Sequence, residues 1–91
     1  MIKPAQLRAA RALLGWSRED LASAADVSFE TVKRFEVEGS NPTSDTLNKW
    51  RIALELAGVE LIYAGDGKGP GVRLKVDEDL AAMRAKKRGR R

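Results

Sequence analysis

Residues 29–34 bring an aromatic ring and side chains of both charge signs close together. Phe29, Glu30, Lys33 and Arg34 fall at positions i, i+1, i+4 and i+5, which share one side of an α-helix. Lysine and arginine donate hydrogen bonds to O6 and N7 of guanine, glutamate accepts one from N4 of cytosine, and a phenyl ring contacts the methyl group of thymine. A helix with this side facing outward therefore has the chemistry to read base edges in the major groove of DNA.

The composition excludes most of the chemistry that enzymes use. The chain has no Cys and no His, so it offers no disulfide, no thiolate or imidazole metal site, no Cys nucleophile and no His base. Its paired acids, Glu19 with Asp20 and Glu78 with Asp79, are adjacent in sequence and suit helix N-termini better than acid-base catalysis. The glycine-rich residues 65–71 lack the spacing of a phosphate-binding loop. We therefore expect no catalytic site, no cofactor and no bound metal.

Charge is unevenly distributed along the 91 residues, a length that suits one domain. Residues 1–58 carry eight basic and eight acidic side chains, so the whole net charge of +4 lies in residues 59–91. Six cations close the chain with no acid among them: Arg84, Lys86, Lys87, Arg88, Arg90 and Arg91. They suit either a nonspecific clamp on DNA or a solubilising tail. No apolar run approaches the roughly 18 to 20 residues of a membrane span, so we expect a cytoplasmic, nucleoid-associated protein with no membrane partner.

Helical periodicity predicts the scaffold that must hold residues 29–34 outward. Apolar spacing, with glycines at positions 15, 39 and 58 as stops, indicates helices over about residues 4–14, 17–25, 28–38 and 43–57. Ser17 and Ser28 suit the N-caps of the second and third helices, and Thr43 or Ser44 suits that of the fourth. The second and third helices, separated by a tight turn, form a helix-turn-helix.

Two charged residues fall on the apolar faces of these predicted helices. Arg11 lies inside the stripe that begins at Leu7, and Glu36 lies beside Phe35 on the inward face of residues 28–38. Arg11 is unexpected in an apolar stripe unless it has a partner.

After residue 58 the pattern changes from helical to alternating. Val59, Leu61 and Tyr63 alternate on one side of a predicted strand, and a second alternating run occupies residues 72–76 after the glycine-rich turn. Asp77 suits the N-cap of a last short helix that continues through Leu80 and Met83. The sequence thus predicts a mainly α fold of four to five short helices and a β-hairpin. It divides into a DNA-binding domain over residues 1–58, a β-hairpin extension over residues 59–76 and a basic tail over residues 77–91.

The predicted helix-turn-helix resembles the XRE family of regulators, typified by lambdoid phage repressors and Cro. The resemblance covers about residues 4–59 and rests on LLGWSREDLA at 13–22, VSFETVKRFE at 27–36, Pro42, Thr46-Leu47 and Ala53-Leu54. AGVELI at 57–62 looks like the ending of short single-domain members. Two features depart from the family pattern: Asp26 stands where the turn usually has Gly, and residues 37–44 contain no basic side chain.

The resemblance implies a role for each matching position. Phe29, Glu30, Lys33 and Arg34 match base-reading positions of the recognition helix. Four polar residues match positions that contact phosphates or sugars: Ser17, Arg18, Ser28 and Thr31. Arg11 and Glu36 match a buried ion pair that ties the first helix to the third.

We therefore expect a repressor-like regulator that binds a palindromic DNA operator as a homodimer, with two recognition helices about 34 Å apart. The hairpin has apolar side chains on both faces, so it is a candidate dimerisation element. The alternative function is a protein-interaction module, such as the antitoxin of a toxin–antitoxin pair, with autoregulatory DNA binding. At the level of single residues, Phe29 can instead pack against the domain, and Lys33 and Arg34 can form a solvated face offset by Glu30.

Overall fold

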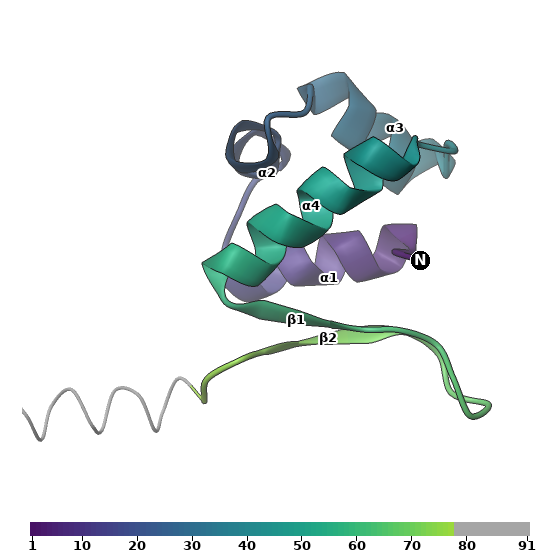
Figure 1. The fold of residues 1–91 in the computed structure, drawn as a ribbon. Coiled ribbons are helices and arrows are strands. Elements are labelled where there is room, and N and C mark those ends of the chain that lie inside the picture. Colours follow the sequence, from purple (N-terminus) through teal and green to yellow (C-terminus); the bar gives the residue numbers. More distant parts are fainter. Residues whose placement is uncertain (78–91) are drawn as a thin grey trace, which may run out of the picture.

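The computed structural model describes residues 1–77, which form four helices followed by a two-stranded antiparallel sheet (Figure 1). The elements are α1 Pro4–Leu14, α2 Arg18–Ala25, α3 Phe29–Glu38, α4 Ser44–Ala57, β1 Val59–Ile62 and β2 Gly71–Leu74. The predicted mainly helical fold with a hairpin after the helices is confirmed. The predicted helix through Leu80 and Met83 and the basic run after it lie outside the described residues.

Hydroxyl side chains start three of the four helices. Ser17 accepts a hydrogen bond from the Asp20 backbone N–H, and the Asp20 carboxylate accepts one from the Ser17 N–H, so the pair forms a capping box for α2. Ser28 caps α3 in the same way, without the reciprocal bond. Thr43, and not Ser44, caps α4 by accepting from the N–H of Thr46. Each cap stabilises its helix by about 1 kcal/mol.

The turn between α2 and α3 depends on one residue in the left-handed conformation. Asp26 has φ 55° and ψ 48°, a region that aspartate tolerates better than most residues other than glycine. The backbone N–H of Asp26 closes the end of α2 on the carbonyl of Ser23, and the N–H of Val27 closes it on that of Ala22. Asp26 therefore makes the tight turn that the family usually builds with glycine.

The core lies between the four helices and the inner face of the hairpin. Its fully buried larger side chains are Trp50, Leu7, Leu21, Leu54, Val32 and Val59. The rings of Phe35 and Trp50 stand 5.2 Å apart at 42°, so α3 packs its inward face directly onto α4. Burying each large apolar side chain stabilises the fold by about 1.5 to 3 kcal/mol, which fixes α3 against the rest of the domain.

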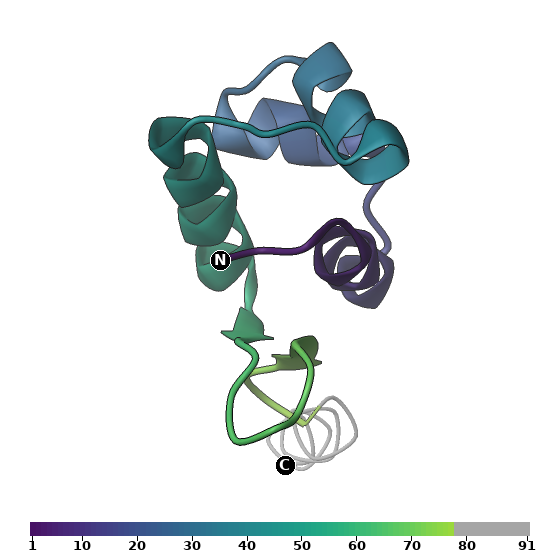
Figure 2. The ribbon, with the colours of Figure 1, turned by 90° about the vertical axis from the view of Figure 1, so that its right-hand side faces the viewer.

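The hairpin packs beneath α1 and α4, on the opposite side of these helices from α2 and α3 (Figures 1 and 2). Its register pairs Val59 with Leu74 and Leu61 with Val72, and these four side chains form the inner face. On the outer face Arg73 donates a hydrogen bond to Glu60. A hairpin of two four-residue strands is marginal alone, so its stability depends on this packing.

The strands are shorter than the alternating pattern predicted, and the prediction is wrong for Tyr63 and Val76. Continuing the observed register would place Tyr63 opposite Pro70, inside the glycine-rich turn of residues 65–71, and β1 ends at Ile62. Tyr63 is 43% exposed and Val76 56% exposed. At the other end, the same register would pair Val76 with Ala57, which is already part of α4.

A buried amide side chain ties the hairpin to α1. Gln6 is 3% exposed, and its Nε2 donates to the carbonyls of Ile62 at 2.9 Å and Gly71 at 3.0 Å. Its Oε1 accepts from the Lys3 backbone N–H at the start of α1. One side chain therefore joins the N-terminus of α1 to the last pair of the sheet.

Candidate nucleic-acid interface

The outward face of α3 carries three of the four predicted base-reading side chains. Glu30, Lys33 and Arg34 are exposed, and Phe29 is half-buried at the start of the helix. Within residues 1–77, none of the three charged side chains forms a hydrogen bond or an ion pair. Their donors and acceptors are therefore available to an external partner. Together they carry one net positive charge.

The opposite face of α3 explains why these side chains point outward. Val32, Phe35 and Glu36 are 0%, 5% and 4% exposed, and the two apolar ones pack into the core. Because residues three and four apart share a helix face, burying 32, 35 and 36 turns 30, 33 and 34 towards solvent. The orientation of the candidate reading face follows from core packing.

Two of the predicted phosphate-contacting residues cap α3. The hydroxyls of Ser28 and Thr31 lie 2.8 Å apart in a hydrogen bond, and the Ser28 oxygen also accepts from the Thr31 N–H. Ser28 is exposed and Thr31 half-buried. Both hydroxyls thus stand at the N-terminus of α3, whose positive dipole end favours an anion.

A shallow hollow joins the start of α2 to the start of α3. Its volume is about 370 Å³, and it is lined by Ser17, Arg18, Phe29, Arg11 and Glu19. It brings together two predicted phosphate-contacting residues and the half-buried Phe29. Phe29 thus lines this hollow with a half-buried side chain.

Glu36 is the centre of an arginine cluster that the sequence predicted only in part. Arg11 donates to both oxygens of Glu36, through Nε to Oε2 and through Nη2 to Oε1, each at 2.7 Å. A third bond from Arg11 runs to the Trp16 carbonyl at 2.9 Å. The hydrogen bond to Glu36 raises the pKa of Arg11 above its ordinary value, although burial alone would lower it.

Two further arginines join this cluster and had no signal in the sequence. Arg18 donates from Nε to Oε1 of Glu36 at 3.0 Å, and Arg8 donates from Nη1 to the Glu36 backbone carbonyl at 2.6 Å. Their partner lies 18 and 28 residues along the chain, a separation at which local spacing carries no information. The cluster connects α1, α2 and α3 through a single residue of α3.

Arg18 therefore has a hydrogen-bond partner within the domain that its predicted role did not include. We expected it to be free to bind a phosphate, but its Nε is bonded to Glu36 and its side chain is only 32% exposed. Its other nitrogens make no hydrogen bond to residues 1–77. The arrangement leaves Arg18 able to bridge Glu36 and an anion at the rim of the hollow.

Residues 1–77 hold no cluster of three acidic side chains that could bind a metal ion. None of their helices has the length and hydropathy to cross a membrane.

Comparison with known proteins agrees with this geometry. The helix-turn-helix family model HTH_3 matches residues 7–61, which begin inside α1 and end inside β1. This span is more than half of the chain and includes the hollow and the whole of α3. A search of curated proteins found no significant match. The chain belongs to the helix-turn-helix family of DNA-binding transcriptional regulators, of the XRE type.

Proposed function

We propose that the chain represses transcription by binding a palindromic DNA operator as a homodimer, with α3 in the major groove of each half-site. One observation carries the proposal. Lys33 and Arg34 are exposed on α3 and bond to nothing else in residues 1–77, whereas the opposite face of the helix is buried in the core. A two-fold dimer on such a site places its two recognition helices about 34 Å apart, one turn of DNA.

Each predicted base-reading side chain of α3 has a distinct chemical use at the base edges. Arg34 and Lys33 donate to guanine O6 and N7, and Arg34 alone has the planar fork for a bidentate contact. Glu30 accepts from cytosine N4. Phe29, half-buried beside the hollow, contacts a thymine methyl.

Phosphate contacts on both sides of α3 would fix its register on the duplex. The N-termini of α2 and α3 carry Ser17 and Ser28, and Thr31 and Arg18 stand beside them. Contacts of this kind position the protein without carrying sequence information. Residues 37–44 carry no cation, so the six cations of residues 84–91 supply further phosphate contacts in this proposal.

Selection from randomised duplexes tests the reading role of α3. The wild-type chain should enrich an inverted repeat, whereas K33A/R34A should bind duplexes with little sequence preference and an unchanged melting temperature. One good bidentate contact provides about 1 to 3 kcal/mol of discrimination between bases. The matched control is K49A/K68A, which removes the same charge at two exposed sites on α4 and the hairpin turn. An unchanged preference in K33A/R34A would show that α3 does not read the bases.

A second function, as the antitoxin of a toxin–antitoxin pair, has one observation in its favour. Leu13, Leu56 and Val76 are 38%, 84% and 56% exposed. Two of them, Leu13 and Val76, line a hollow of about 350 Å³ at the ends of α1 and β2, far from α3. A toxin docked there would leave α3 free for DNA. Co-purification with a small protein encoded beside this chain would support that function if it is lost in Val76→Asp, whose site lines the hollow. A chain that purifies alone would argue for the plain repressor.

A further inference from the structure

A third hollow lies between α4, the N-terminal residues and Tyr63, which follows the last residue of β1. Its volume is about 360 Å³, within the range of about 300 to 1,000 Å³ that small-molecule pockets occupy. We call it the Arg51 hollow, and its lining includes Met1, Ile2, Leu47, Asn48, Arg51 and Tyr63. None of these residues belongs to the proposed DNA-reading face, so a molecule bound there would leave α3 free.

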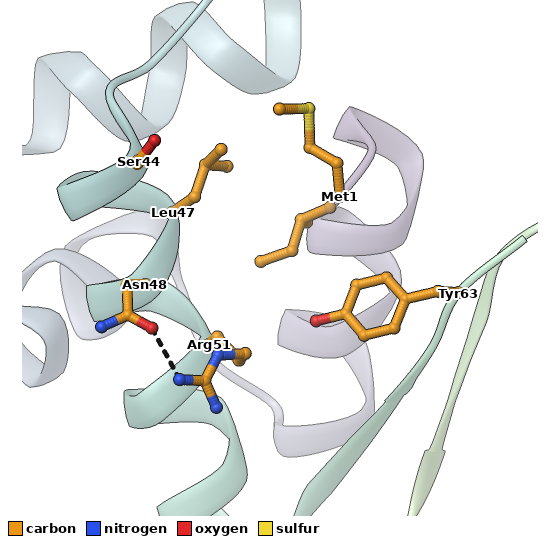
Figure 3. A pocket seen from close by; sticks show the side chains of 7 residues that line it. Met1, Ser44, Leu47, Asn48, Arg51 and Tyr63 are labelled. Atoms are coloured by element: carbon orange, nitrogen blue, oxygen red, sulfur yellow. Dashed lines mark hydrogen bonds between the residues drawn. The ribbon is translucent and has the colours of Figure 1, made fainter.

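The Arg51 hollow has an apolar end and a polar end. Figure 3 shows Met1 and Leu47 towards one end. At the other end the Tyr63 ring reaches across from the chain after β1 towards Arg51, which lies one helical turn beyond Leu47. Ile2 adds further hydrocarbon and is 5% exposed. A molecule that fills the hollow therefore needs an apolar part and a polar group at one end of it.

Free hydrogen-bond donors collect at the polar end. Arg51 donates from Nη2 to Oδ1 of Asn48 at 2.6 Å and from Nη1 to Oε1 of Glu55 at 2.8 Å, so both acceptor atoms are already in use. The Asn48 amide nitrogen, Nε of Arg51 and the Tyr63 hydroxyl form no hydrogen bond within residues 1–77. A ligand group that completes this end must therefore accept hydrogen bonds.

The charges at the Arg51 hollow favour an anion over a cation. Arg51 and the Met1 ammonium are its two cations, and no acidic residue of the described chain lines it. Glu55 offsets Arg51 from outside the lining, which leaves one positive charge unbalanced. A carboxylate meets both requirements, because its two oxygens only accept hydrogen bonds, carry one negative charge and match the planar fork of a guanidinium.

We infer that the Arg51 hollow is a binding site for a small carboxylate with an apolar tail. The carboxylate binds the side chains of Arg51, Asn48 and Tyr63, and the tail lies against Ile2 and Leu47. The inference goes beyond the proposed function, since binding at this hollow does not depend on the reading of DNA by α3.

Titration of the isotopically labelled full chain with hexanoate, hexanamide, hexylammonium and acetate tests the site through amide chemical shifts. Hexanoate should give saturable shifts at Leu47, Asn48, Arg51 and Tyr63. It should bind about tenfold or more tightly than hexanamide, which lacks the charge, and than acetate, which lacks the tail. Hexylammonium should give no saturable shift.

Two substitutions at the polar end test where the carboxylate binds. Arg51→Gln should weaken hexanoate binding about tenfold or more, because a hydrogen bond between charged groups is lost, and Tyr63→Phe should weaken it about threefold or more. Arg73→Gln is the matched control, since Arg73 also pairs with a glutamate but lies 67% exposed on the outer face of the hairpin. The control should bind hexanoate as the wild type does.

Three results would each overturn the inference: no saturable shift with hexanoate, hexanamide or hexylammonium binding as tightly as hexanoate, or an Arg51→Gln chain that binds hexanoate as tightly as Arg73→Gln. The amide spectrum of each variant shows whether it is folded. Because the side chain of Arg51 is 39% exposed and Tyr63 is 43% exposed, neither belongs to the core, and one folded variant is sufficient for the comparison.

Discussion

Replacing Glu36 with alanine is the perturbation whose effect the structure defines best. The Glu36 side chain is fully buried and accepts three hydrogen bonds, two from Arg11 and one from Arg18. In Glu36→Ala the Arg11 guanidinium, 16% exposed in the wild type, keeps only its bond to the Trp16 carbonyl and has no carboxylate beside it. The substitution thus leaves an uncompensated cation next to the core.

The burial of the two arginines sets the free energy of unfolding that Glu36→Ala is expected to lose. Breaking a buried ion pair by removing one partner costs about 3 to 5 kcal/mol. Arg18 is 32% exposed and can rehydrate, and Arg11 can do so in part, which places the cost near the lower figure, about 3 kcal/mol. A domain of this size has a total stability of about 5 to 15 kcal/mol, so a large share would be lost.

Urea unfolding followed by fluorescence of Trp16 and Trp50 measures this loss. We expect a lower midpoint with an unchanged slope, because the surface exposed on unfolding stays the same. Asp45→Ala is the matched control, since its pair with Lys49 spans 3.5 Å between exposed side chains and is worth about 0 to 1 kcal/mol. A Glu36→Ala cost below about 1 kcal/mol would refute the idea that this cluster holds α3 in place.

Three further outcomes follow from other contacts. Gln6→Leu should lower the free energy of unfolding by about 1 to 3 kcal/mol, because it removes the buried amide that bonds two hairpin carbonyls, and a loss no larger than that of an exposed substitution in urea unfolding would contradict this role. The hydrogen bond from Arg73 holds the pKa of Glu60 below its ordinary value, so the stability that Glu60 contributes is present at neutral pH and is lost as the pH falls below about 4.5 and through the folded-state pKa. Arg73→Ala should therefore flatten the acid limb of a stability–pH curve, and an unchanged limb would count against the pair. A chain that ends at Val76 should show a weaker salt dependence of DNA binding, since each lost phosphate contact removes about 0.9 from the slope of log K against log salt, and equal slopes would show that the basic tail makes no contact.

Much of the fold was predictable because its signals are local. The caps at Ser17 and Ser28, the glycine stops and the apolar stripes each act within one helical turn, so the sequence alone located the four helices. The ends of the strands were not predictable from the sequence, because they depend on which residue lies opposite in the paired strand. Tyr63 looked like a third inward position of β1 until the register placed Pro70 across from it.

In the candidate site, too, some features were predictable from local patterns in the sequence and others were not. The outward position of Lys33 and Arg34 follows from the helical period, and the Arg11–Glu36 pair was implied by the family resemblance. The roles of Arg8, Arg18 and Gln6 depend on contacts 18 to 65 residues apart in the chain, which no local pattern encodes. For Gln6 the one available signal was a polar residue beside the apolar Leu7 in α1, which is too common to point to a buried role.

In this account, base recognition and phosphate binding belong to different parts of one small protein. α3 presents a nearly neutral face whose orientation is fixed by its buried side and by Glu36, and the whole net positive charge of the chain lies after residue 74. Specificity and phosphate affinity would then respond to different substitutions, which is why the variants above change one property at a time.

Chemical-shift mapping of the isotopically labelled full chain, titrated with the duplex that it selects, tests the central claim most directly. The account predicts that the backbone amides of residues 17–18 and 28–34 shift the most and that those of β1 and β2 stay nearly unchanged. Large shifts confined to the hairpin or to the hollow lined by Leu13 and Val76, with α3 unaffected, would contradict it.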